Sequence, residues 1–345
     1  MPNSALEIMR KGFSHINEGQ LLLILLILFS FFYIQTSMTA APSLEEGKKL
    51  FKEEKFQEAK AVLEQVIKSD PRNHEAYFIL GKIYYSEKNY DKSIENLEKA
   101  VELKDSVSEY HLWYGSSYLM KAQKSGKIKA LFRAKKGVGE LEKAVKLDST
   151  DAEVRFSLFQ YYLVAPGIAG GDKKKAEKEA KIIQGLDPFL GAQAWAAYWE
   201  REKDLIRAEE YLIEAVKFDT SSTFKAKYSL GYFYQVNKKY DKAITSFNEI
   251  LTKKPEEMNA LYQLGKTYIL AQHNLEEAED CFTKYLKVEP SENSPSWAAA
   301  HWRLGMVYDL QGKKELALQE SKKALELEPD NKEFKKTLQE LQKKK

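Results

Sequence analysis

Hydrophobic residues recur with the period of an α-helix along most of the chain. One helical face is built from residues at i, i+3, i+4 and i+7, such as Tyr77, Leu80, Gly81 and Tyr84. A polar segment at residues 89–91 then predicts a turn. The helical spacing resumes at i, i+4 and i+7 with Ser93, Leu97 and Ala100. The pattern therefore predicts two helices joined by a short turn.

This helix pair is repeated along the chain. Five of the expected first helices contain a Gly-x-x-Tyr motif, which begins at Gly81, Gly115, Gly231, Gly265 and Gly305. Gly47, Gly81 and Gly115 are evenly spaced, and Gly231 and Gly265 are separated by the same interval. A fixed period of about 34 residues is typical of stacked helix-turn-helix units. Such an array offers a long surface for partners rather than one pocket for chemistry.

Small residues in each repeat indicate close packing between helices. A glycine inside a helix costs about 1 kcal/mol relative to alanine. Recurrent helical glycines therefore need a packing reason, namely that a larger side chain would overpack the contact. The second helices carry matching small residues, Ala59, Ser93, Ala243, Ala278 and Ala317. Four of these helices are followed by a proline that should end them, Pro71, Pro255, Pro290 or Pro329.

These offsets resemble the tetratricopeptide repeat (TPR), most closely in the series Leu230, Gly231, Tyr234, Ala243, Phe247 and Pro255. The resemblance implies an all-α, right-handed superhelical solenoid of about eight TPR-like helix-turn-helix repeats, followed by a C-terminal capping helix at 332–345. The expected repeats span residues 42–73, 74–107, 108–151, 152–190, 191–223, 224–257, 258–292 and 293–331. The third repeat has a basic insertion, the fourth has a Gly-rich loop, and the fifth is degenerate.

Composition narrows the possible roles. The net charge of +3 does not favour nucleic acid as a partner. Cys281 is the only cysteine, so the chain forms no internal disulfide, and its place in a second helix predicts a small buried residue.

Residues 1–41 are expected to be a signal peptide or a signal-anchor. The segment from Gly19 to Leu44 has no charged residue, and Arg10 and Lys11 precede it. The short apolar centre of this segment, at 21–34, is typical of a cleaved signal. With its flanks, however, the uncharged stretch is long enough to anchor the chain as a single pass through a bilayer. Either alternative predicts extracytoplasmic repeats, most readily in the periplasm.

A second face of the first helices is expected to line a partner-binding groove, as in the TPR arrays that the chain resembles. Its residues are Phe78, Tyr85, Leu112, Phe156, Trp195, Trp199, Tyr228, Tyr232, Tyr262 and Trp302. The alternative role for these side chains is packing between neighbouring repeats. An aromatic groove favours a peptide or amphipathic helix as ligand, or stacked sugar rings. Lys82 and Lys266 alone do not make the clamp with which some TPR modules hold a C-terminal carboxylate, so we expect no such binding.

The insertion at residues 121–136 holds seven basic residues and no acidic one. Ile128, Leu131 and Phe132 share one helical stripe. The insertion is either a contact for an anionic partner or lipid headgroups, or a solvated helix that packs through this stripe.

The loop at residues 165–172 is rich in glycine and precedes a Lys-rich helix. It either cradles an anion or is a long turn in which Asp172 caps the next helix. It lacks the Gly-Lys-Ser/Thr of a nucleotide-binding loop. From about Lys127 to Ala215 the chain resembles bacterial envelope TPR proteins with a Pro-Gly-Ile-x-Gly-Gly loop, a resemblance that implies no catalytic activity.

The sequence predicts neither an enzyme nor a metal or cofactor site. The five histidines are scattered at different offsets of the repeat, and no nucleophile motif occurs. We therefore expect a non-catalytic, extracytoplasmic scaffold that mediates protein–protein interactions in the assembly or organisation of envelope proteins. The alternative is a receptor or carrier for a glycan or lipid that uses the same aromatic face. The sequence does not predict an oligomeric state.

Overall fold

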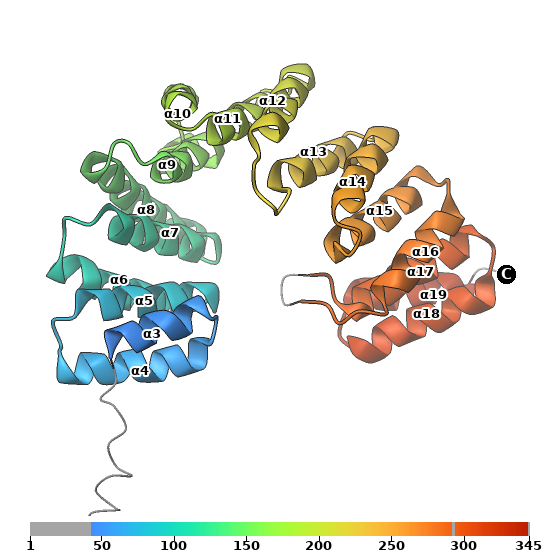
Figure 1. Ribbon diagram of the computed structural model, residues 1–345, viewed down its shortest axis with the longest axis horizontal. Helices are drawn as coiled ribbons and strands as arrows, with labels where there is room; N and C mark the ends of the chain where they lie inside the picture. Colours follow the sequence, from blue (N-terminus) through green and yellow to red (C-terminus); the bar gives the residue numbers. More distant parts are fainter. Residues whose placement is uncertain (1–42, 292–293, 344–345) are drawn as a thin grey trace, which may run out of the picture. The chain divides into compact units, whose positions relative to one another are not determined.

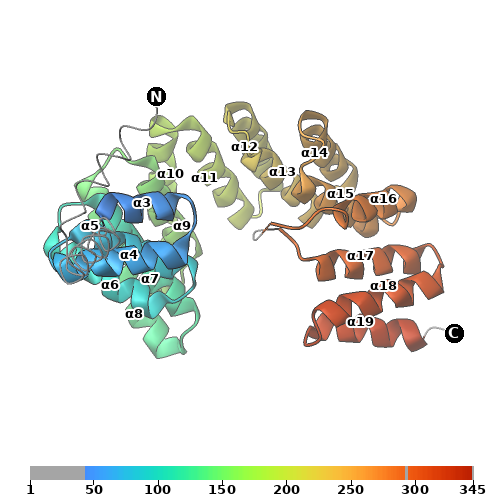
Figure 2. The same cartoon turned by 60° about the horizontal axis from the view of Figure 1, so that its bottom comes forward.

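The computed structural model describes residues 43–291 and 294–343. These residues form 17 α-helices and one short 3-10 helix, without a strand among them (Figures 1 and 2). By its internal contacts the chain divides into two units, which meet in sequence at Leu147 and Asp148. The expected all-α class is confirmed for this part of the chain. The expected signal or anchor at residues 1–41 lies outside the described residues.

The first unit is built from three helix pairs. They are α3 (Leu44–Lys52) with α4 (Phe56–Ser69), α5 (His74–Ser86) with α6 (Tyr90–Leu103), and α7 (Ser108–Gln123) with α8 (Lys127–Leu147). Helix α5 contacts both α3 and α4, and α7 contacts both α5 and α6. Each pair therefore buries its apolar side against the next pair, as a stacked array requires.

The second unit continues with five pairs and a final helix. They are α9 (Ala152–Val164) with α10 (Lys173–Leu186), α11 (Pro188–Arg201) with α12 (Leu205–Phe218), α13 (Lys225–Val236) with α14 (Tyr240–Lys253), α15 (Met258–Ala271) with α16 (Leu275–Tyr285), α17 (Trp297–Leu310) with α18 (Lys314–Leu327), and α19 (Lys332–Lys343). The 3-10 helix η1 (Gly167–Ala169) lies between α9 and α10. Within the described residues, no helix combines the length and apolar character that a membrane span needs.

Local sequence sets where the helices begin and end. The side chain of Asn73 accepts a hydrogen bond from the backbone N–H of Ala76 and caps α5. Asp187 caps α11 in the same way, and Pro188 occupies the first helical position, where no N–H is needed. The prolines that we expected to end the second helices lie beyond the ends of α4, α14, α16 and α18. In that order they are Pro71, Pro255, Pro290 and Pro329.

The recurrent glycines lie where paired helices touch. A Cβ atom added to Gly81 would lie 2.5 Å from Cγ of Leu97, and one added to Gly231 would lie 2.7 Å from the ring of Phe247. Real Cβ atoms do not approach carbon atoms so closely. The packing reason expected for these glycines is therefore confirmed.

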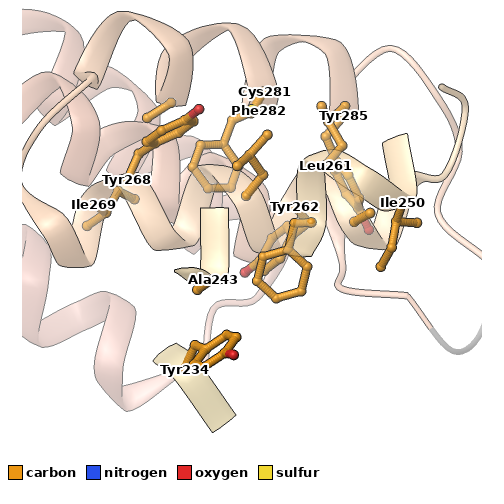
Figure 3. Packing of buried hydrophobic residues seen from close by; sticks show 14 of the residues in the cluster. Tyr234, Ala243, Ile250, Leu261, Tyr262, Tyr268, Ile269, Cys281, Phe282 and Tyr285 are labelled. Atoms are coloured by element: carbon orange, nitrogen blue, oxygen red, sulfur yellow. The ribbon is translucent and has the colours of Figure 1, made fainter. Parts of the chain in front are cut away.

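The core of the second unit is continuous over several helix pairs. Figure 3 shows part of it, where Tyr262, Phe282 and Tyr285 gather between α15 and α16. The ring of Tyr262 meets that of Phe282 edge to face, with centroids 5.5 Å apart. Cys281 is buried beside them, as expected, and burial raises the pKa of its thiol to about 12.

Helix α19 covers the last repeat. Phe334 and Leu341 of α19 are buried against this repeat, whereas most other side chains of α19 face solvent. This arrangement confirms the expected capping helix, because the end of a stacked array must present a polar outer surface.

Candidate functional site

The strongest candidate surface lies on the first helices of the second unit. On α11, Trp195 and Trp199 are partly buried and stack with ring centroids 6.1 Å apart and an angle of 18° between the planes. Trp195 also stacks on Tyr211 of α12, with centroids 5.9 Å apart. The guanidinium carbon of Arg207 lies 3.3 Å from the ring centre of Trp199. The two tryptophans therefore form one stacked series with Tyr211 and Arg207.

Helix α13 carries an equivalent aromatic pair. Tyr228 and Tyr232 stack with centroids 6.0 Å apart, and 40% of Tyr232 is exposed. The hydroxyl of Tyr228 donates to Glu257. Burial is the main cause that raises the pKa of this phenol, and the negative charge of Glu257 raises it further. We call Trp195, Trp199, Tyr228 and Tyr232 the aromatic face. Trp199 and Tyr228 pack against the same core cluster.

Two cations occupy the following first helices. Lys266 lies on α15 and Arg303 on α17, and these helices contact each other. Burial, followed by the nearby charge of Arg303, lowers the pKa of the Lys266 ammonium. No ion pair joins either side chain to a carboxylate among the described residues. The guanidinium carbon of Arg303 lies 4.3 Å from the ring centre of Trp302, and Nε of Arg303 is buried without a hydrogen-bond partner. A desolvated cation is stabilised by an anionic partner, so this cation pair can receive a carboxylate.

We did not predict this pair, because the sequence groups Lys266 with Lys82. The structure places Lys82 in the first unit, where its ammonium lies 4.9 Å from the ring centre of Trp113 and ion-pairs with Glu109. The offset within the repeat gave no signal for this difference, because Lys82 follows Gly81 just as Lys266 follows Gly265.

Three residues that we expected in the groove are buried packing residues instead. Phe78 stacks on Tyr110, with centroids 4.5 Å apart, and Tyr262 belongs to the α15–α16 core. Trp302 packs on Phe334 of the capping helix and donates from its indole N–H to Thr337. Each is 6–8% exposed. The sequence pattern could not separate these residues from Tyr228, because all four lie three positions before the glycine of their repeat.

The remaining expected groove residues are distributed over both units. Tyr85 and Leu112 are partly buried in the first unit, and Tyr85 meets Trp113 edge to face. Phe156 is partly buried on α9 and packs against Phe159. These three side chains contact their own unit. Among the expected residues, those that stack on each other are Trp195 with Trp199 and Tyr228 with Tyr232.

The Gly-rich loop is held by its own hydrogen bonds. The backbone N–H groups of Ala169, Gly170 and Gly171 donate to carbonyls of Pro166 and Gly167. Asp172 accepts from the N–H groups of Lys174 and Lys175 and caps α10. These donors are already used, which favours the long turn over the anion cradle.

Two of the described histidines, His111 and His301, contact carboxylates of the helix paired with their own. His111 is fully buried, and its Nδ1 lies 2.7 Å from Oε2 of Glu140. Nδ1 of His301 lies 2.5 Å from Oε2 of Glu320. Each of these contacts joins the two helices of one pair. No group of three metal-ligating side chains occurs among the described residues.

Comparison with known proteins identifies the repeats. Models of the tetratricopeptide repeat family match residues 44–108, 259–292 and 298–331. These segments are tetratricopeptide repeats, as expected from the sequence. They lie in both units and coincide with the helix pairs that begin at α3, α5, α15 and α17.

Curated relatives share this repeat at low identity. Human superkiller complex protein 3 is 26% identical over 239 residues, which are 68% of this chain and 15% of that protein. DnaJ homolog subfamily C member 3 of Gallus gallus is 25% identical over 258 residues, which are 66% of this chain and 48% of that protein. The chain therefore spans less than half the length of either relative.

Solved structures show a similar likeness. A tetratricopeptide repeat protein from Parabacteroides merdae has a TM-score of 0.49 and 13% identity, with 87% of this chain and 97% of that chain covered. The Cut9–Hcn1 hetero-tetramer of APC/C has a TM-score of 0.48 and 15% identity, with 90% of this chain and 58% of that chain covered.

Proposed function

We propose that this chain is a non-catalytic scaffold that holds protein partners outside the cytoplasm, in the assembly or organisation of cell-envelope proteins. Tetratricopeptide repeats in general mediate protein–protein interactions and are generally non-catalytic, which supports the coarser part of this proposal. The finer part rests on the aromatic face and on the N-terminal sequence.

The observation that carries the proposal is the pairing of aromatic side chains on α11 and α13. Trp and Tyr supply large contact areas and lose little conformational entropy on binding, because each has few rotatable bonds. Stacking on Tyr211 and Arg207 holds the tryptophans in place before a partner arrives. The partner that this face fits is an amphipathic helix or peptide with apolar side chains. The cation pair adds a preference for an acidic group on that segment.

Export is supported by the sequence of residues 1–41. An uncharged stretch with an apolar centre follows Arg10 and Lys11, an order that keeps the positive residues inside and carries the repeats outward. The resemblance of residues 127–215 to bacterial envelope TPR proteins supports the same compartment.

The test of the partner site begins with a photo-crosslinking residue in place of Tyr232 in intact cells, followed by mass spectrometry of the captured partner. Trp199→Ala combined with Tyr232→Ala should then reduce capture of that partner at least tenfold. Trp297→Ala is the matched control, since this exposed tryptophan lies outside the aromatic face. Far-UV circular dichroism should stay unchanged in both variants. Unchanged capture by the double variant would show that the aromatic face is not the binding site.

A binding experiment on the same protein distinguishes the scaffold from the alternative function. Saturable binding of a purified glycan or lipid to the aromatic face, without any protein partner, would favour a receptor or carrier.

N-terminal sequencing of the mature chain and an alkaline phosphatase fusion after Lys345 test export. An inactive fusion would contradict the extracytoplasmic location.

A further inference from the structure

The α7–α8 hairpin is longer than its neighbour in the first unit. In the α5–α6 pair, the hydroxyl of Ser93 donates to the carbonyl of Gly81, 12 residues earlier. The corresponding close contact between α7 and α8 joins Gly115 and Gly137, which are much further apart in the sequence. Shared between two helices, the extra residues extend the hairpin by about 7 Å, at a rise of about 1.5 Å per residue. We call residues 121–136 the hairpin tip.

The tip exposes two large apolar side chains. Ile128 is 75% exposed and Phe132 is 69% exposed. They lie one helical turn apart, on the side of α8 opposite the buried Gly137 and Leu141. This finding argues against the alternative in which the insertion packs through its apolar stripe, of which only Leu131 is partly buried. Two neighbouring exposed apolar side chains offer a contact for another surface.

A basic hollow is lined in part by Arg133, which directly follows Phe132 in α8. It has a volume of about 290 Å³ and lies between the α5–α6 turn and the tip. Its lining includes four cationic side chains, Lys88, Lys121, Lys124 and Arg133. Asp91 is the only acidic residue in the lining, and it is paired with Lys121. Arg133 donates to the hydroxyl of Ser125. The hollow therefore has an excess of positive charge that an anion would balance.

We propose that the hairpin tip docks on the surface of an anionic phospholipid bilayer. The headgroup phosphate occupies the basic hollow, where Lys124 and Arg133 donate to its oxygens. Ile128 and Phe132 enter the boundary between headgroups and acyl chains. Exposed Lys129 flanks them and reaches a further headgroup. The combination of exposed apolar and basic residues on one helix is typical of interfacial membrane binding.

A lipid surface accounts for both the apolar and the basic residues of the tip. A nucleic acid or an acidic protein would also neutralise the basic residues. A nucleic acid, however, would leave Ile128 and Phe132 in water. The contact is separate from the aromatic face, because all of its residues belong to the first unit. A membrane contact at this point would hold the repeats beside a bilayer even after cleavage of a signal.

The test uses the full chain with an environment-sensitive fluorophore on Ile128→Cys, which keeps Phe132 in place. Native Cys281 is 4% exposed and stays unlabelled. The same fluorophore on Gln65→Cys, an exposed position on α4, is the matched control. A probe at residue 128 reports the tip itself, whereas vesicle sedimentation would also report the apolar run at residues 21–34. Vesicles contain phosphatidylcholine with or without phosphatidylglycerol.

We expect the emission at residue 128 to rise and shift to the blue with phosphatidylglycerol vesicles, while residue 65 shows no change. Lys124→Gln and Arg133→Gln should each weaken partition about fivefold. Phe132→Ser should weaken it on the order of tenfold. Raising the salt concentration should weaken it as well, because salt screens the charges. No response at residue 128, or an equal response to pure phosphatidylcholine, would overturn the proposal. A response to polyglutamate but not to vesicles would overturn it in favour of an acidic protein partner.

Discussion

A Cβ atom on Gly115 would lie 2.6 Å from the carbonyl oxygen of Gly137. The obstacle is backbone, which cannot turn aside as a flexible side chain can. We therefore expect Gly115→Ala to reduce the free energy of unfolding by roughly 1–3 kcal/mol. Gly139→Ala on the same hairpin should instead stabilise by about 0.5–1 kcal/mol, since its Cβ meets nothing within 4 Å. Urea denaturation followed by circular dichroism measures both. Equal effects would mean that α7 and α8 do not touch at this point.

The buried His111–Glu140 contact should make the first unit sensitive to acid. Burial raises the pKa of Glu140, but hydrogen bonds from His111 and Lys136 outweigh it and hold the pKa below the ordinary value of 4.5. A carboxyl with a lowered folded pKa contributes stability above its unfolded pKa, and this stability is lost as the pH falls through the folded pKa.

Glu140→Gln should thus destabilise the chain by roughly 1.5–3 kcal/mol at pH 7. The difference from the parent chain should shrink as the pH falls below about 4.5, because the parent carboxyl then loses its charge too. Urea midpoints measured across this pH range test the prediction. A difference that is independent of pH would rule out the charged hydrogen bond.

The Gly-rich loop requires one of its glycines for space. A Cβ on Gly171 would overlap the carbonyl oxygen of Ala165, whereas one on Gly167 meets nothing within 4 Å. Gly171→Ala should therefore force the loop between α9 and α10 to rearrange, and Gly167→Ala should leave it intact. Hydrogen exchange at the amide of Asp172, which donates to the carbonyl of Tyr162, reports the loop. Equal protection in both variants would contradict this account.

Trp302 should hold the capping helix. Trp302→Ala removes the ring that packs on Phe334 and the hydrogen bond to Thr337. We expect a loss of roughly 3–5 kcal/mol, concentrated in α19. Amide exchange should accelerate in 332–343 before it does in α15 or α16. Trp297→Ala serves as the comparison, since this side chain is 39% exposed. Unchanged protection of α19 would show that Trp302 does not anchor it.

The repeat pattern was sufficient to predict the helix pairs and their contacts. Gly81 and Leu97 lie on the inner faces of their own helices. The helical period and the side-chain size that place them there are local properties. The capping helix was predictable for the same reason, since Phe334 and Leu341 lie on one face of a single helix. The roles of the aromatic residues were less predictable. Tyr262 and Tyr228 both lie three positions before the glycine of their first helix, yet Tyr262 is buried and Tyr228 is only partly buried.

The sequence by itself determined the class of fold, the helix ends and the glycines of close packing, because each is marked by residues within one repeat. Only the tertiary structure decided which side chains are exposed. Lys266 acquires its neighbour Arg303 from the next repeat, and the hollow beside Arg133 requires residues of the preceding helix pair. Exposure and charge at a surface depend on what packs beside each residue, and that is a property of the stacked helices rather than of any one of them.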